Sequence, residues 1–280
     1  MLPILTVTQP SEYYGKPIQN VIIDHCSVSW GTDDLMYVIF GTDNVTIQWS
    51  IMSEGLVNCG PECGGKAFLM AYGARSVSFH HNLSVHNYIR WPEVSGGGSS
   101  PGYTGRLDFV NNVQYNGNGS DTVVDPYHGP IYANFVGNYW QDGPSSLAMN
   151  KRYPVIRALG DLTYSGQAGL YVAGNYGRYW TPNGGGTISY GLASPTTSII
   201  WGDNGGLAIP PTRYAYPLVT TTDAATARTQ VLAQAGATLP ARDAVDQRVI
   251  NDITRGTGGW ITHPADVGGW PLLASGAPPA

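Results

Sequence analysis

The stretch that decides the fold is RSVSFHHNL, residues 75–83, which is followed closely by IRWP, residues 89–92. It contains an alternating strand that ends in Asn82, and the same strand-plus-small-polar pattern recurs along the chain. The last residues of the recurring segments are separated by 24, 32, 30, 26 and 37 residues, at positions Cys26, Ser50, Asn82, Asn112, Asn138 and Asn175. Strands of fixed pattern with loops of variable length are typical of a parallel β-helix, in which inward amides of successive coils stack into a ladder.

The sequence therefore predicts an all-β protein, with an antiparallel sandwich as the competing interpretation because it also has short strands with turn signals. We expect a single domain over residues 1–280, with coils over about 20–176 and a loop-rich part and helical tail over 177–280. In that tail, Asp223 to Gly236 and Asp243 to Gly256 each have an Asp cap, helix-forming residues and a Gly stop. These two short helices are expected to dock on the side of the coils or to cover an open end.

Composition limits the partners. The chain has 280 residues, a formal net charge of −5 and 12% charged residues, with no basic run. Nucleic acid is therefore not an expected partner, and no apolar stretch reaches the roughly 18 residues of a membrane helix. Residues 1–5 show no signal-peptide pattern, which leaves a cytoplasmic protein or a missing natural beginning.

The three cysteines give limited information. Cys59 and Cys63 share a Gly/Pro-rich loop and could form a local disulfide. A zinc site is the alternative, although no second pair or His cluster follows at a suitable spacing. Cys26 falls at a ladder position and is expected to be a small buried residue.

Four charged residues stand out because coil geometry would bring them together. Asp33 and Asp34 precede one strand, Lys66 opens another, and Arg90 lies at the equivalent place one coil further on. Stacked at about 4.8 Å per coil, they would line one face. Such a row suits an acidic polysaccharide: carboxylates can hold Ca²⁺, which bridges to a uronate carboxylate and favours β-elimination.

Each residue also has a plainer interpretation. Asp33-Asp34 could belong to an ordinary turn, Lys66 could be a solvated loop residue, and Arg90 could stack on Trp91. His80-His81 resembles a metal pair, but adjacent strand residues face opposite sides, so we expect one ring in the core and the other at the surface.

Several motifs, in order, resemble bacterial pectate lyases of polysaccharide lyase family 1. They are IDHCS at 23–27, HHN at 80–82, the R-x-P of residues 90–92 and DFVNNV at 108–113, and the tail over 235–246 and 267–271 is also similar. The resemblance covers nearly the whole chain. It implies a right-handed parallel β-helix that cleaves polygalacturonate with the help of Ca²⁺.

Transferred by motif, the resemblance implies that Arg90 is the base, Lys66 contacts the substrate carboxylate, and Asp33 is an acidic ligand of the metal. We expect Asp34, directly beside Asp33, to be a second metal ligand. Trp91 and Arg152 are expected to be substrate contacts. An Arg base has a free pKa above about 12, so neighbouring cations and exclusion of water would have to favour proton loss.

The departures from the family pattern concern calcium and the second Arg. The family's next acidic ligand falls on Tyr37, and two further Asp positions fall on Gln9 and Ser11, with Glu12 adjacent. The second Arg of the R-x-P-x-x-R pattern falls on Ser95. Only about 20 residues precede the IDHCS motif, so we expect either a truncated chain or a first coil that is covered by its own amino-terminal segment or another subunit.

The expected function is calcium-assisted β-elimination of homogalacturonan by a secreted or periplasmic enzyme, the location being implied by the resemblance. Two alternatives stay open. One is a non-catalytic β-helix that binds an acidic glycan, favoured by the missing ligands. The other is a glycoside hydrolase, for which Asp33, Asp34 and Glu54 are the available carboxylates.

Overall fold

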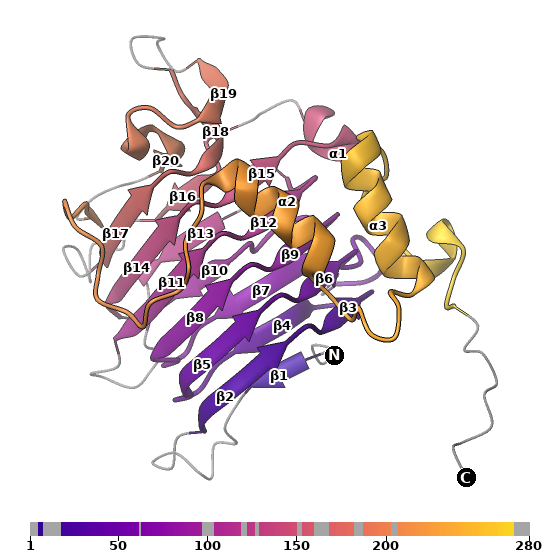
Figure 1. Cartoon of the computed structure of the whole chain (residues 1–280), viewed down its shortest axis with the longest axis horizontal. Helices are drawn as coiled ribbons and strands as arrows, with labels where there is room; N and C mark the ends of the chain where they lie inside the picture. Colours follow the sequence, from indigo (N-terminus) through magenta and orange to yellow (C-terminus); the bar gives the residue numbers. More distant parts are fainter. Residues whose placement is uncertain are drawn as a thin grey trace.

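The structure is a computed structural model. It describes residues 5–7, 18–61, 63–96, 104–118, 122–126, 129–149, 153–159, 168–181, 187–202 and 207–271. Three sheets run along the molecule and wind around a shared core as a right-handed parallel β-helix (Figure 1). This confirms the predicted fold class and excludes the antiparallel sandwich.

Each sheet takes one strand from each coil, so its neighbours are far apart in sequence. Sheet A contains, in order, β1 (Leu5–Val7), β4 (Asp34–Val38), β7 (Lys66–Met70), β10 (Glu93–Ser95), β13 (Thr122–Asp125), β16 (Ile156–Ala158) and β20 (Ile200–Trp201). Sheet B contains β2 (Gln19–Asp24), β5 (Asp43–Gln48), β8 (Ser76–His80), β11 (Gly105–Val110), β14 (Ile131–Val136), β17 (Ala168–Ala173) and β21 (Leu207–Ala208).

Sheet C contains β3 (Ser27–Ser29), β6 (Ile51–Ser53), β9 (Leu83–Val85), β12 (Val113–Tyr115), β15 (Tyr139–Gln141), β18 (Tyr176–Trp180) and β19 (Ile188–Leu192). All of its pairings are parallel except that of β18 with β19, which is antiparallel. The coils continue beyond the predicted end near residue 176, because β20 and β21 add a further strand to sheets A and B. The Gly- and Pro-rich composition of that region concealed these two-residue strands.

The predicted ladder lies at the turn between sheets B and C. The side-chain oxygen of Asn112 accepts from the backbone N–H of Asn82 at 2.9 Å, and the amide of Asn112 donates to the Phe79 carbonyl at 2.9 Å. Asn138 and Asn175 repeat this arrangement one and two coils further on. Each buried amide therefore pairs backbone groups that the turn leaves without strand partners.

Cys26, the first residue of the ladder, is less buried than the later ladder residues. In the described part, β2 and β3 are the outermost strands of sheets B and C, and Cys26 is only half-buried. The expectation of a buried Cys26 was therefore wrong, because no described coil of these sheets lies beyond it.

Aromatic side chains fill the interior of the coils. Phe79 stacks on Phe68 at 4.5 Å and on Phe109 at 5.3 Å between ring centroids, and Phe135 continues the stack. All four rings are fully buried. Because parallel strands place the same position of every coil at one level, one aromatic column packs several coils together.

The two predicted helices are α2 (Ala224–Gln234) and α3 (Ala244–Arg255), and they lie against the outer face of sheet C (Figure 1). Asp223 and Asp243 are their N-caps, as predicted. Val231 of α2 and Val249 of α3 are fully buried in one cluster with strand residues of sheet C. The helices therefore cover the side of the β-helix. Among the described residues, three further short helices were not predicted: α1 (Pro144–Leu147), η3 (Thr196–Ile199) and η4 (Pro264–Val267).

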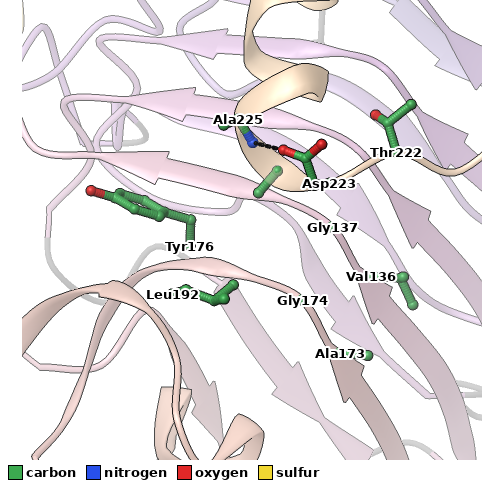
Figure 2. Close-up of a pocket in the computed structure, with 10 residues that line it drawn as sticks. Val136, Gly137, Ala173, Gly174, Tyr176, Leu192, Thr222, Asp223 and Ala225 are labelled. Atoms are coloured by element: carbon green, nitrogen blue, oxygen red, sulfur yellow. Dashed lines mark hydrogen bonds between the residues drawn. The ribbon is translucent and has the colours of Figure 1, made fainter.

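A small apolar hollow of about 430 Å³ lies where α2 begins, beside the ends of β14 and β17 (Figure 2). The Asp223 carboxylate accepts from the Ala225 N–H at 3.0 Å and from the Thr226 N–H at 3.0 Å. These amides at the helix start are therefore already paired within the chain.

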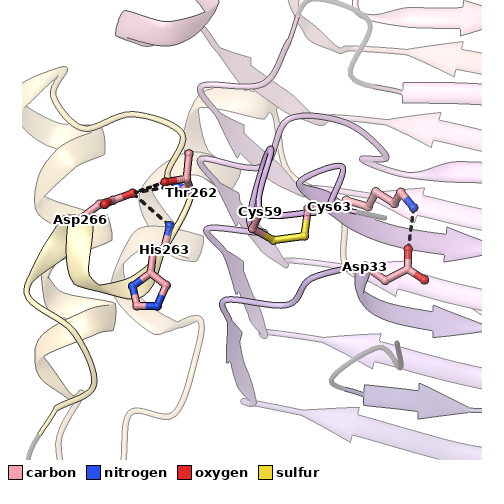
Figure 3. Close-up of a disulfide and its surroundings, with 7 residues drawn as sticks. Asp33, Cys59, Cys63, Thr262, His263 and Asp266 are labelled. Atoms are coloured by element: carbon pink, nitrogen blue, oxygen red, sulfur yellow. Dashed lines mark hydrogen bonds and ion pairs between the residues drawn. A yellow bond between two sulfur atoms is a disulfide. The ribbon is translucent and has the colours of Figure 1, made fainter. Parts of the chain in front are cut away.

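The loop between β6 and β7 carries the disulfide between Cys59 and Cys63 (Figure 3). It confirms the local pairing and excludes the alternative zinc site at these two cysteines. The loop ends at Gly64 and Gly65, directly before Lys66 at the start of β7.

Candidate active site

The structure brings Asp33, Asp34, Lys66 and Arg90 together on the outer face of sheet A. They line one groove with a volume of about 460 Å³. Asp34 and Lys66 are register partners at the starts of β4 and β7, and Lys66 is bridged to Ile89, directly before Arg90. The coil repeat thus places charges from three successive turns side by side, as the sequence predicted.

Each predicted carboxylate is paired with a predicted cation. Lys66 Nζ lies 2.6 Å from Asp33 Oδ1, and Arg90 lies 2.6 Å from Asp34 Oδ2. Figure 3 draws the ion pair of Asp33 as a dashed line. The side chains of Lys66, Asp33 and Arg90 are each about one-fifth exposed, whereas Asp34 is almost fully buried. Neither the turn nor the solvated-loop interpretation accounts for such packing.

Arg90 is held between two carboxylates. Its Nε lies 2.8 Å from Glu93 Oε2, in addition to the pair with Asp34. Burial alone would lower the pKa of Arg90, but the charges of Asp34 and Glu93 raise it above its ordinary value. This is the reverse of the expected effect of neighbouring cations, and it keeps the guanidinium protonated while both carboxylates are ionised.

Asp34 is the buried acid of the groove. Burial raises its pKa from 3.8 to about 6; Arg90 opposes the shift, whereas nearby Asp33 adds to it. One carboxylate oxygen, Oδ1, is buried and has no hydrogen-bond partner among the described residues. Such an orphaned oxygen is an available ligand for a hard cation.

Two acidic residues of the groove were missed by the sequence reasoning. Glu93 on β10 is in register with Leu69 on β7, which in turn is in register with Tyr37, the place of the family's second ligand. Asp125 on β13 is the register partner of Ser95, the place of the family's second Arg. The i,i+3 spacing of Arg90 and Glu93 was a usable signal, whereas Asp125 required the strand register.

These additions change the charge of the groove. Its lining includes four carboxylates, Asp33, Asp34, Glu93 and Asp125, and two cations, Lys66 and Arg90. With all six ionised, two positive and four negative charges leave a local net charge of −2. A polyanion would be repelled by this surface unless a cation were bound with it.

Trp91 does not line the groove. It is 1% exposed and lies edge-on to Phe79 at 5.2 Å and Phe109 at 5.8 Å in the core. Its assignment as a substrate-binding residue was wrong, as was the idea that Arg90 stacks on it. The positive φ of 69° at Arg90 turns the chain there, and the large apolar ring of the next residue is buried.

Aromatic residues form the other wall of the groove. Phe40 and Tyr72 stack with ring centroids 5.4 Å apart, and Tyr37 lies on the same face. Arg152, Gln9, Ser11 and Glu12 lie outside the described residues. The predicted roles of these four positions therefore stay predictions.

The His80-His81 pair does not face opposite sides. The Nδ1 atoms of the two rings lie 3.1 Å apart, and His81 stacks on Trp49 with centroids 4.4 Å apart. The reason is the positive φ of 56° at His81, which ends the strand alternation. In the described part of the chain, no three His, Cys, Asp or Glu side chains are grouped so as to hold a metal.

Comparison with known proteins finds fungal relatives. The chain is 34% identical over 262 residues to a probable pectate lyase C of Aspergillus fumigatus, which covers 92% of this chain and 54% of the relative. The corresponding protein of Aspergillus terreus is 33% identical over 263 residues, and that of Emericella nidulans is 32% identical over 266. The chain is a homologue of these fungal proteins.

The homology supports a pectate lyase-like family, but the relatives found give no support to the bacterial part of the resemblance. The chain spans about half the length of these curated relatives. No protein-family model matches it. None of the described helices combines the length and the hydropathy needed to cross a bilayer.

Proposed function

We propose that the chain is a polysaccharide lyase that cleaves polygalacturonate by β-elimination in the groove on sheet A. The observation that carries this proposal is the row of Asp33, Asp34, Lys66 and Arg90 on one sheet face, in a homologue of proteins named pectate lyase. A linear groove across successive parallel strands matches a linear polymer. Its two cations, Lys66 on β7 and Arg90 one coil further on, can meet successive carboxylates of a uronan.

Lys66 has the role of clamping a substrate carboxylate. Its ammonium is partly exposed in the groove and is held by Asp33 at 2.6 Å, so its position is fixed before substrate arrives. Fixed positive charge near the carboxylate stabilises the enolate-like charge that develops when the C5 proton leaves.

The oxygen donors of this groove fit calcium, a hard cation that prefers oxygen ligands. Asp34, with its unpartnered Oδ1, and Asp33 are the residues that would hold it. When bound, the ion would neutralise the uronate carboxylate and so acidify the adjacent C5 proton. No ready-made group of three acidic ligands is present among the described residues, which favours a metal brought in together with the substrate.

Arg90 has the role of the base. Asp34 and Glu93 hold its guanidinium from two sides and fix its direction. The elimination needs it neutral: it then takes the C5 proton, the C4–C5 double bond forms, and the C4–O electron pair leaves with the glycosidic oxygen. If Asp34 bound a cation, its charge would raise the pKa of Arg90 less, and proton loss from Arg90 would become easier.

A non-catalytic glycan-binding protein is the second candidate, and the raised pKa of Arg90 favours it. A hydrolase has less support, because Glu54 is fully buried and paired with Arg248 and Trp30 away from the groove.

Secretion is part of our proposal: a disulfide between Cys59 and Cys63 is typical of an oxidising compartment.

The experiment is detection of the unsaturated product by its ultraviolet absorbance, with polygalacturonate in calcium and in chelator. We expect calcium-dependent product, together with a loss of activity in Asp34→Asn that is greater at low calcium than at high calcium. Binding of polygalacturonate without any product would support the second candidate. A saturated reducing end without unsaturated product would support the hydrolase.

A further inference from the structure

A further cavity lies on the outer face of sheet B and shares no lining residue with the groove on sheet A. It has a volume of about 330 Å³ and is lined by Arg106, Tyr132, Tyr214, Ala215 and Tyr216. This volume lies within the roughly 300–1,000 Å³ of small-ligand sites. Arg106 on β11 and Tyr132 on β14 are direct register partners, so a cation and an aromatic ring stand side by side on the sheet.

The charge of Arg106 is available to a ligand. Its side chain is exposed, and among the residues that the structure describes no carboxylate forms an ion pair with it. Arg213 provides the contrast on the same face, since it reaches Asp108 at 2.6 and 3.3 Å. The buried carboxylate of this surface is therefore already neutralised by a different arginine.

The aromatic rim is held in place by the sheet. The Tyr214 N–H donates to the Asn134 side chain at 2.9 Å, and the Asn134 amide donates to the Tyr214 carbonyl at 3.1 Å. Tyr132 and Tyr214 form an edge-on pair with centroids 5.3 Å apart, and the Tyr216 hydroxyl donates to the Arg106 carbonyl at 3.1 Å. The pocket is thus formed before any ligand binds, which lowers the entropy loss on binding.

Gly169 contributes space to this arrangement. It is the register partner of Tyr132 on β17, and a Cβ at this position would lie 1.9 Å from the Tyr214 hydroxyl oxygen. A side chain there would displace the Tyr214 ring. The absence of a side chain on β17 therefore determines where the rim lies.

We propose that this Arg–Tyr pocket binds one uronate residue of an acidic glycan, outside the groove and without a metal ion. A guanidinium matches a carboxylate with two parallel hydrogen bonds, and tyrosine rings offer apolar faces with polar edges to a pyranose ring. The choice of a uronate rests on the proposed function, because the polymer cleaved in the groove is the acidic glycan within reach. The pocket would hold the polysaccharide at a second point and so increase the local concentration of substrate at the groove.

The test is calorimetric titration of the whole chain with trigalacturonate in the presence of chelator, which removes metal-bridged binding in the groove. We expect the parent to bind, and Arg106→Gln to bind at least about tenfold more weakly, since a hydrogen bond to a charged group contributes about 1.5–3 kcal/mol. Arg255→Gln, which removes an exposed arginine from the end of α3, is the matched control and should bind like the parent.

Gly169→Ala tests the rim without changing charge, and we expect it to weaken binding as well while the thermal unfolding midpoint shows that the chain remains folded. The fully methyl-esterified trisaccharide should not bind measurably. The proposal is overturned if the parent does not bind in chelator or if Arg106→Gln binds as tightly as the parent. Binding with this pattern in a protein that gives no unsaturated product would sink the proposed lyase function and leave this site in place.

Discussion

At the scale of single residues, the central feature of the groove is that the carboxylates of Asp34 and Glu93 both pair with Arg90. Asp34 is buried with a raised pKa, yet it offers one oxygen to Arg90 and leaves the other without a partner. Glu93 holds the second side of the guanidinium. Asp34, Arg90 and Glu93 therefore form one ion-pair network, and in the proposed mechanism substrate or cation displaces part of it before Arg90 acts as the base.

Asp34 should make stability depend on pH. Its folded pKa of about 6 exceeds its ordinary 3.8, so the folded state binds more protons and stability falls as pH rises from about 4 to 6. The penalty at pH 7 is on the order of 3 kcal/mol. Chemical denaturation from pH 4 to 7 should show this fall in the parent and a smaller fall in Asp34→Asn. Parallel profiles for the two proteins would contradict the assignment.

Glu93 should set the pH range in which Arg90 acts. Glu93→Gln removes one carboxylate that raises the pKa of Arg90, so the ascending limb of the pH–rate profile of product formation, along which Arg90 loses its proton, should move to lower pH. Glu93→Asp retains the charge and should keep a profile closer to that of the parent. An unchanged limb in Glu93→Gln, with the fold intact, would show that this carboxylate does not control the base.

At the scale of elements, buried polar side chains connect neighbouring coils and attach the helices. The Asn ladder pairs the backbone between sheets B and C, and Glu54, which is fully buried, accepts from Trp30 at 2.8 Å and from Arg248 of α3 at 2.6 and 2.7 Å. The ladder was predictable because its residues recur at the ends of alternating strands. The attachment of α3 was not, since residues 54 and 248 become neighbours only after the chain has wound several times.

The ladder should contribute strongly to stability. Asn112→Ala leaves the buried Asn82 N–H and Phe79 carbonyl without their partners, and we expect a loss of roughly 3–5 kcal/mol in the free energy of unfolding. Asn251→Ala, at an exposed position on α3, is the control and should change stability by less than about 0.5 kcal/mol. Denaturant titration compares the two, and similar small losses would refute the role of the ladder.

Arg248 should fasten α3 to the coils. Arg248→Ala leaves the Glu54 carboxylate buried with Trp30 as its remaining side-chain partner among the described residues, and breaking such a pair costs about 3–5 kcal/mol. Hydrogen exchange should accelerate in Ala244–Arg255 more than in the strands of sheet B. The double variant Arg248→Ala with Glu54→Gln should recover part of the loss, because no charge is then left buried. No recovery would indicate that packing alone accounts for the effect.

At the scale of the whole molecule, the coil repeat determines the fold and brings the candidate site residues together. It aligns residues about 24–37 positions apart into rows, and this let the sequence predict the fold and the meeting of Asp33, Lys66 and Arg90. It could not reveal which side chains turn inward where strand alternation is interrupted. Positive φ at His81 and Arg90 reversed the expected directions of the histidine pair and of Trp91.

Register explains the remaining difference between expectation and structure. Glu93 and Asp125 enter the groove because β10 and β13 pair with their neighbours at particular residues, a fact that spacing alone does not fix. The pocket on sheet B depends similarly on residues 213–216 crossing the strands. Long-range crossings of this kind leave no periodic signal in the sequence.

The most direct test of the central claim is the rate of unsaturated product formation from polygalacturonate, with calcium, for the parent, Arg90→Ala and Arg255→Ala. If Arg90 is the base, the parent and Arg255→Ala should give the same calcium-dependent signal, and Arg90→Ala should lose at least about 100-fold, in the range of general-base catalysis. An Arg90→Ala protein that is folded and as active as the parent would contradict the mechanism.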